Sequence, residues 1–313
     1  MQTPEEVGES YDLIATRFIS SLGEFPDISA AFYNNNFRKT LNQAQKDKHS
    51  WVLQGINFKP GQRILDIGCG WGPMLKEISD KGGYALGLTV SENQTKYCKQ
   101  HGLEALLLDW KDANPERLGK FDGIVSIGAF EHFCSIDEYT QRKQEQIYAN
   151  FFKFCHDCLQ DDGKFYLQTM SWGNFWLNGE PNYPQDFNQG AQKDSDPKIL
   201  ATLIGLSSWW PPVSLDQITK TANPYFTARE GNSGREDYIK TFKEWKIAWE
   251  RSSINNTIED IKAIARAVVS KRYRRKLRLF NEMVNRQYFR EAFVSHLLDH
   301  WRIFFEKKTS FTN

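Results

Sequence analysis

Residues 64–72 read Ile-Leu-Asp-Ile-Gly-Cys-Gly-Trp-Gly, a short apolar run that leads directly into a glycine-rich turn. The apolar run is typical of a buried strand, and its glycines let the backbone turn tightly and approach a ligand. The wider Gly-x-Gly-x-x-Gly spacing of a dinucleotide fingerprint is absent, which argues against a nicotinamide dehydrogenase. The compact pattern therefore predicts an adenosine-containing cofactor lying over the end of a parallel sheet.

Strand-like segments alternate with helical patterns along most of the chain. They fall near residues 63–66, 84–88, 105–108, 121–127, 163–169, 225–229 and 301–305. Strands separated by helices imply right-handed crossovers and a mostly parallel sheet. We therefore predict a single α/β domain with a seven-stranded, mostly parallel sheet.

The predicted domain has four parts along the chain. They are an N-terminal helical cap (1–55), the cofactor-binding core (56–172), an insertion (173–212), and a final part with the remaining strands and a helical block on the substrate side (213–313). The insertion is rich in Asn, Pro, Gly, Gln and Asp but also holds several tryptophans, which favours a docked lid over the substrate. Trp245 and Trp249 lie four residues apart, on one face of the predicted helical block.

The composition is that of an ordinary globular protein, with 313 residues, 40% hydrophobic residues and a net charge of +1. Ten tryptophans indicate either heavy core packing or an aromatic-lined pocket, and both interpretations stay open. The five cysteines form no disulfide framework, and Cys155-His156-Asp157-Cys158 lacks a second ligand pair, so we expect no metal site. The first residues lack a basic leader and no apolar run is long enough to span a bilayer, which predicts a cytoplasmic protein.

Polar side chains stand at the ends of the first three predicted strands. Asp66 lies where a carboxylate can hydrogen-bond a cationic amino-acid group. Asp109 and Trp110 close the third strand, where an acid can accept from an adenine amino group while the indole covers the ring. Glycine-rich turns also occur without ligands, but the companion residues at the other strand ends favour a cofactor site.

The chain resembles the cyclopropane fatty-acid synthase and mycolic-acid methyltransferase family, which uses S-adenosylmethionine (SAM). The resemblance rests on the 65–72 turn, on Gly-Leu-Thr-Val-Ser-Glu-Asn-Gln at 87–94, and on Ser-Ile-Gly-Ala-Phe-Glu-His-Phe at 126–133. Weaker similarity reaches 40–45 and 237–245. The resemblance implies a class I, Rossmann-like methyltransferase fold. It also implies a SAM site made of Ser29, Asp66, Gly68, Cys69, Gly70, Gly72, Thr89, Val90, Gln94, Asp109 and Trp110.

In that family an alkene of an acyl chain attacks the methyl group of SAM, and a bound bicarbonate accepts a proton. Glu131 and Tyr238 match two of the family's bicarbonate ligands, whereas Gln168 stands where the family has His. Because Gln carries no charge, bicarbonate would be held more weakly here, or Glu131 itself would act as the base with a pKa raised by burial. The resemblance implies an unsaturated lipid as substrate and a cyclopropane or a methyl branch as product.

A second departure and a related branch keep other functions open. The family's Tyr-Ser-Cys segment appears here as Ile28-Ser29-Ala30. The plant-type benzylisoquinoline N-methyltransferases resemble the same family and use a Glu-His pair, matching Glu131 and His132, to orient an amine. An amine N-methyltransferase is therefore the first alternative. A non-catalytic SAM-binding scaffold is the second, and the retained Glu131 and Tyr238 argue against it.

Residues 271–278 hold six basic side chains in eight positions. Such a run is either a solvated helix face or a contact for anionic phospholipid headgroups or for an acyl-carrier partner. Because the rest of the chain is electrically balanced, we do not expect nucleic acid as a partner.

Overall fold

The computed structural model describes residues 21–173, 199, 202–204, 209–252, 268 and 270–309. Its centre is a seven-stranded sheet in the order β3-β2-β1-β4-β5-β7-β6. The strands are β1 (Arg63–Ile67), β2 (Tyr84–Thr89), β3 (Ala105–Leu107), β4 (Phe121–Ile127), β5 (Leu159–Trp172), β6 (Phe226–Ser233) and β7 (Leu298–Lys307). Neighbouring strands pair in parallel except at β7, which runs antiparallel to β5 and β6. The predicted seven-stranded, mostly parallel sheet is confirmed.

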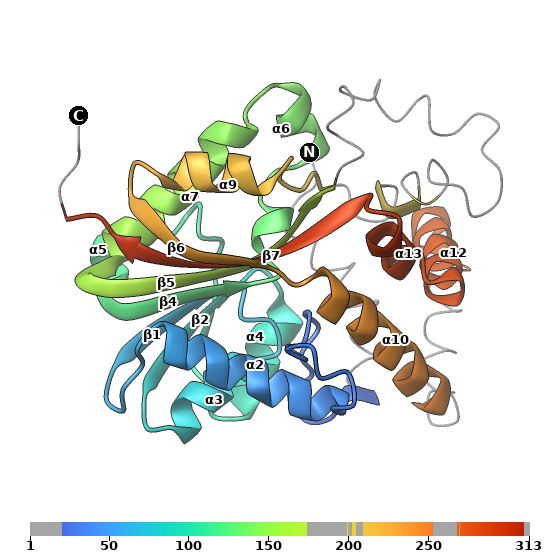
Figure 1. Cartoon of the computed structure of the whole chain (residues 1–313), viewed down its shortest axis with the longest axis horizontal. Helices are drawn as coiled ribbons and strands as arrows, with labels where there is room; N and C mark the ends of the chain where they lie inside the picture. The colour runs from blue at the N-terminus through green and yellow to red at the C-terminus, as the bar shows by residue number, and fades with distance from the viewer. Residues whose placement is uncertain are drawn as a thin grey trace.

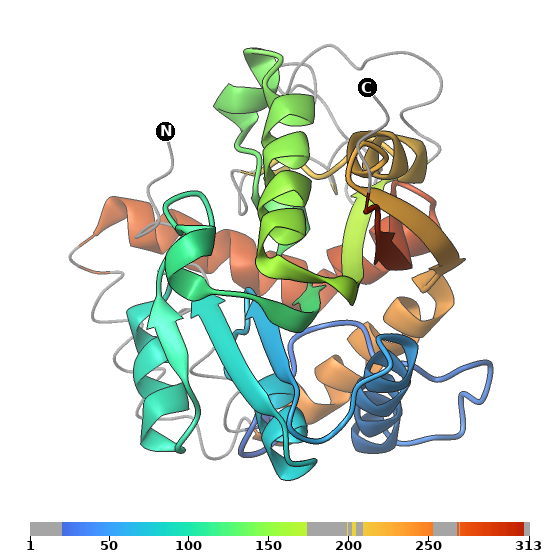
Figure 2. The same ribbon diagram turned by 90° about the vertical axis from the view of Figure 1, so that its left-hand side faces the viewer.

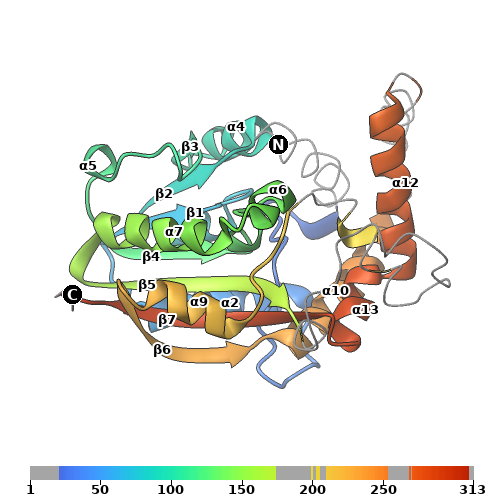
Figure 3. The same ribbon diagram turned by 90° about the horizontal axis from the view of Figure 1, so that it is seen from above.

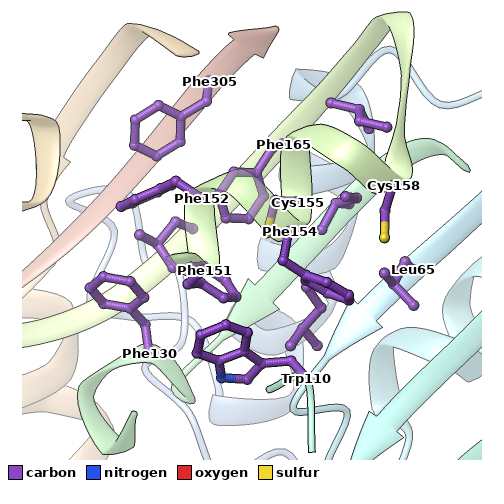
Figure 4. Close-up of a cluster of buried hydrophobic side chains, with 14 of the residues drawn as sticks. Leu65, Trp110, Phe130, Phe151, Phe152, Phe154, Cys155, Cys158, Phe165 and Phe305 are labelled. Atoms are coloured by element: carbon purple, nitrogen blue, oxygen red, sulfur yellow. The ribbon is translucent and has the colours of Figure 1, made fainter. Parts of the chain in front are cut away.

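Helices cover both faces of the sheet (Figures 1 and 2). One face carries α2 (Leu41–Gly55), α3 (Pro73–Asp80) and α4 (Glu92–Gln100), and the other carries α5 (Pro115–Leu118), α6 (Ile136–Thr140), α7 (Gln144–Cys158) and α9 (Leu215–Ala222). An apolar cluster fills the layer between α7 and the sheet, with Phe151, Phe152 and Phe165 at its centre (Figure 4). This dry packing fixes the strand ends from which the pocket is built.

A helical block lies beyond the carboxyl ends of the parallel strands (Figures 1 and 3). It consists of α10 (Arg235–Ser252), α12 (Lys271–Arg286) and α13 (Tyr288–Val294), within the range predicted from the sequence. Trp245 and Trp249 both join its apolar cluster, as their spacing predicted. Figure 3 shows α12 at the edge of the molecule, extending away from the sheet.

The predicted helical cap is only partly correct. Within the described part of residues 1–55, α2 is the main helix, while residues 23–39 are irregular. Gly23 has a φ of 94°, outside the helical region, and Pro26 has no amide proton to donate. Residues 1–20 of the predicted cap lie outside the described residues.

Residues 26–33, which we call the strap, are fixed by side chains from four distant elements. Three side chains donate to its carbonyl oxygens: Gln45 Nε2 to Ser29 O (2.9 Å), Gln168 Nε2 to Ala30 O (3.1 Å) and Arg302 Nη2 to Ala31 O (2.7 Å). The amide of Ala31 in turn donates to Thr241 Oγ1 (3.1 Å). Arg302 is itself held by Asp237 at 2.7 Å, in a buried ion pair. Because both groups are removed from water, the Ala31 carbonyl stabilises the buried guanidinium by accepting from a second of its nitrogens. The strap is therefore irregular in form but firmly positioned.

Other predictions divide between the described and undescribed residues. Most of the 173–212 insertion lies outside the described residues, so the lid stays a prediction.

Cys155 and Cys158 lie buried and free on α7, and no group of three or more His, Cys, Asp or Glu among the described residues could hold a metal ion. In the part of the chain that the structure describes, the helices are too short or too polar to span a bilayer. The cytoplasmic location stays a prediction.

Candidate active site

A pocket of about 320 Å³ opens where β1, β2, β3 and β4 end. Such a position is the usual ligand site of open parallel sheets. The predicted cofactor residues that line it are Ser29, Asp66, Gly68, Cys69, Gly70, Thr89, Val90, Gln94, Asp109 and Trp110. The structure thus brings together every predicted cofactor residue except Gly72.

The three glycines of the turn have different roles. A Cβ on Gly68 would lie 2.3 Å from the Cβ of Ala129, so this glycine allows the turn to pack against the segment after β4. Gly70 has a φ of 55° and open space around its Cβ position. Gly72 is the N-cap of α3 and packs on Leu103 and Cys98, so its role is structural and it lies outside the pocket wall.

Asp66 ends β1 with a carboxyl group that is almost fully buried. Burial raises its pKa to about 7, and the nearby carboxylate of Asp27 adds to this effect. The charged form of Asp66 is therefore costly in this buried position and would be stabilised by a cationic ligand.

The ends of β2 and β3 complete this side of the pocket. The Thr89 hydroxyl donates to Gln94 Oε1 at 2.6 Å, and the Ser91 side chain caps α4. Burial raises the pKa of Asp109, which accepts a bond from the backbone amide of Lys111. Trp110 lines the pocket and joins the apolar cluster of Figure 4.

Glu131 lies on a short 3₁₀ helix, η1 (Phe130–His132), just after β4. Its buried carboxylate accepts a bond from Thr169 Oγ1 at 2.8 Å. Burial raises its pKa to about 7, although bonds from its own amide, Thr169 and the Met170 amide oppose the rise. The Cβ position of Gly128 lies 3.9 Å from Glu131 Oε1 and 3.8 Å from Ser29 Cβ. Gly128 lines the pocket and Glu131 does not, so this carboxylate lies behind the pocket wall at Gly128.

His132 lines the pocket directly. Burial lowers its pKa to about 3, so the ring is neutral at physiological pH. Its ring contacts Trp209 with centroids 4.7 Å apart. Trp209 forms a β-bridge with Ser135, and the Trp210 amide donates to Cys134 O at 2.8 Å. The last residues of the predicted insertion are thus docked on the segment that follows Glu131.

Gln168 and Tyr238 do not line the pocket. The amide of Gln168 accepts from Tyr166 Oη at 2.9 Å and donates to Ala30 O at 3.1 Å. Tyr238 belongs to the apolar cluster that contains Ala30 and Met170, and its ring contacts His300 at 5.0 Å. Both residues therefore stand behind the strap rather than in the pocket wall.

The residues of the pocket region that were not predicted from the sequence include the trio Asp27, Lys48 and His49. Asp27 and His49 line the pocket, and Lys48 is fully buried behind them. The only sequence signal for Asp27 was its position two residues before Ser29, which was a predicted cofactor residue. Its partners Lys48 and His49 lie more than twenty residues away on α2. A Lys-His pair in a helix is not a motif that indicates a binding site.

Comparison with known proteins agrees with this architecture. The family model for mycolic acid cyclopropane synthetase matches residues 1–293. Cyclopropane mycolic acid synthase 2 of Mycobacterium leprae is 38% identical over 228 residues, which cover 67% of this chain and 68% of that protein. The cyclopropane-fatty-acyl-phospholipid synthase of Escherichia coli K12 is 28% identical over 242 residues, 76% of this chain and 54% of that protein. The chain thus spans about half the length of the E. coli relative.

A solved structure shows the same fold. The crystal structure of mycolic acid cyclopropane synthase CmaA1, complexed with SAH and CTAB, matches with a TM-score of 0.70 and 24% identity. The match covers 97% of this chain and 98% of that one. The fold is therefore that of the class I methyltransferases, as the sequence predicted. With a family model that spans nearly the whole sequence, the chain belongs to the mycolic acid cyclopropane synthetase family.

Proposed function

We propose that this chain is a SAM-dependent methyltransferase that methylates carbon in an unsaturated acyl chain. The observation that carries the proposal is the position of Glu131, whose carboxylate lies across Gly128 from the donor pocket. Family membership and the lipid-modifying names of the relatives support an acyl acceptor. Methyl transfer to the alkene leaves a carbocation, which Glu131 would neutralise by removing a proton. Loss of that proton from the transferred methyl group gives a cyclopropane, and loss from a neighbouring chain carbon gives a methyl-branched alkene.

The pocket wall fits SAM. Asp66 would accept from the ammonium group of the methionine part, and Asp109 would accept from the adenine amino group. The open space at Gly70 lets the main chain approach the ligand without a side chain between them. When bound, SAM supplies an electrophilic methyl group on its sulfonium. The protein's own task is to exclude water and to aim the acceptor carbon at that group.

Glu131 is the residue we assign to proton removal. With a pKa of about 7, a large fraction of its carboxyl groups is ionised near neutral pH and can accept a proton. Gln168 has one amide N–H left after bonding Ala30, which offers little to hold a bicarbonate ion. The negative charge of Glu131 would also repel that ion. We therefore assign the proton to Glu131 and not to bicarbonate.

Glu131→Gln tests this assignment. Turnover should fall by about 10²- to 10⁴-fold, the usual contribution of a general base, while SAH binding stays unchanged. The wild-type enzyme should keep its rate in buffer stripped of carbon dioxide. A rate that depends on added bicarbonate would instead assign the proton to that ion.

The acceptor is tested with SAM that carries a fully deuterated methyl group. Incubation with vesicles of monounsaturated phospholipid should give a lipid product that retains two deuterium atoms if a cyclopropane forms, or three if a methyl branch forms. No lipid product, together with triply deuterated N-methyl product from a pool of amines, would overturn the carbon acceptor in favour of the amine. Release of no SAH with either pool would leave a scaffold role.

A partner surface also follows from α12. Lys271, Arg274 and Arg278 are exposed and lie at helical spacing along it. We propose that they bind anionic lipid headgroups, each basic residue contributing about 1 kcal/mol near the surface. Replacing the three by Gln should weaken binding to vesicles that contain phosphatidylglycerol and reduce its salt dependence. The matched control is the exposed trio Lys81, Lys96 and Lys99; equal effects of both triple variants would contradict a local site.

A further inference from the structure

The donor pocket has a second acidic residue beside Asp66. Asp27, Ser29 and His49 line the same pocket as Asp66, and they come from the strap and from α2. Lys48, the neighbour of His49, is fully buried and does not line the pocket. The wall on this side is thus formed by a carboxylate whose cationic partner stands behind it.

Asp27 is held in its charged form by three donors. Lys48 Nζ and His49 Nε2 lie 2.6 and 2.8 Å from its Oδ2, and the Ser29 hydroxyl donates to Oδ1 at 2.5 Å. Burial would raise the pKa of Asp27, but Lys48 and His49 hold it well below its usual range. A carboxylate offers about four acceptor sites, so one site on Oδ1 stays available.

The charge of Asp27 acts on Asp66 within this wall of the pocket. The charge of Asp27 contributes to the raised pKa of Asp66, and Lys48 opposes it. Two carboxylates in one buried wall repel, and a ligand cation placed between them would relieve that repulsion. The strap that carries Asp27 is fixed by four other elements, so the carboxylate is preorganised for such a ligand.

We propose that Asp27, oriented by Lys48 and His49, binds the ammonium group at the amino-acid end of the donor together with Asp66. This proposal rests on SAM as the donor and is independent of the acceptor. It assigns Asp27 a part in ligand recognition, in addition to its part in holding the strap.

Calorimetric binding of two ligands tests the proposal. SAH carries the amino-acid end, whereas 5′-methylthioadenosine has the same nucleoside and thioether without it. Asp27→Asn should weaken SAH binding by about 10- to 100-fold, the worth of a charge-assisted hydrogen bond, and leave 5′-methylthioadenosine unchanged. The matched control is Asp47→Asn on α2, the helix that carries Lys48 and His49; its ion pair with Lys39 lies away from the pocket wall. An equal loss for both ligands, or no loss for SAH, would overturn the proposal.

A second variant covers the case in which Asp27→Asn fails to fold. Asp27→Glu keeps a negative charge beside Lys48 but moves the carboxylate by one methylene. It should also weaken SAH selectively over 5′-methylthioadenosine, and wild-type affinity for SAH would contradict direct contact.

The pH dependence of SAH binding gives an independent readout. The charged groups that act on Asp66 are Asp27 from the strap and Lys48 from α2, with His49 beside them. Removing the charge of Asp27 should lower the pKa of Asp66. The weakening of SAH binding at low pH should then begin at a lower pH in Asp27→Asn than in wild type. Because such a shift reports the charge of Asp27 acting on Asp66, an unmoved profile would count against an ammonium site shared by the two carboxylates.

Discussion

The side-chain amide of Gln168 donates a hydrogen bond to the carbonyl oxygen of Ala30 and so ties β5 to the strap across 138 residues of sequence. The other end of the amide accepts from Tyr166. An uncharged amide with a donor and an acceptor suits this position, whereas a neutral imidazole could offer the same pair only in another geometry. These two bonds give Gln168 a structural role between β5 and the strap.

Gln168→Leu should destabilise the protein by about 1–3 kcal/mol, because the Ala30 carbonyl and the Tyr166 hydroxyl lose their partner in a buried place. Urea unfolding measures the change. Gln146→Leu is the control, because Gln146 is exposed on α7 and its amide donates to Asn150 Oδ1 on the helix surface. Similar urea midpoints for the two variants would show that the bonds of Gln168 do not stabilise the fold.

Gly70→Ala should weaken binding of the methyl donor much more than it lowers the stability of the fold. The added methyl group meets no protein atom within 4 Å, but it occupies space through which the ligand must approach the main chain. Gly102 also has a positive φ and open space at its Cβ position, and it lies away from the pocket wall. Both variants should therefore share a backbone cost of about 1 kcal/mol in thermal unfolding, while only Gly70→Ala loses SAH affinity. Loss of SAH affinity in both would disprove a local effect.

SAH binding should strengthen as pH rises from about 6 to 8. Asp66 has a pKa of about 7, and below that value the carboxyl must first release a proton before it can pair with an ammonium group. At the acid limit the affinity should fall by about tenfold per pH unit. Titrations at several pH values measure it, and Asp66→Asn should flatten the curve. A flat curve in the wild-type protein would show that Asp66 does not pair with the ligand.

Thr169→Val should shift the pH profile of turnover to higher pH by about one pH unit. The Thr169 hydroxyl donates to Glu131 and favours the charged carboxylate, so its loss raises the pKa of Glu131 further. The base is then ionised only at higher pH. Thr169→Ser retains the hydroxyl and should keep the wild-type profile. An unchanged profile in Thr169→Val would argue that another group takes the proton.

Much of the fold was predictable because it is encoded locally. The turn at 64–72 follows a buried strand, and the alternation of strands and helices after it specifies a parallel sheet. The ends of the strands then placed Asp66, Thr89 and Asp109 at one edge, and the structure brings them into one pocket. These inferences need only periodicity and the rule that parallel strands end at the same edge.

The strap and its partners could not be predicted in the same way. Asp27 meets Lys48 and His49 only after α2 folds back beside it, and Gln168 meets Ala30 only within the complete sheet. The sequence predicted a helical cap over 1–55, yet the chain is irregular around Pro26 because tertiary bonds replace helical ones. Strand β5 is also longer than its apolar pattern, since pairing with β7 extends it to Trp172.

The bond from Arg302 to Ala31 joins residues 271 positions apart, between the strap and β7. The glycine turn can form as soon as β1 and α3 fold, but the opposite wall of the pocket needs β7 in place. During synthesis, donor affinity should therefore appear only after β7 has emerged and joined the sheet. Ligand binding would then report the completion of folding, and a ribosome-bound chain that ends before Leu298 should contain the glycine turn without a closed pocket.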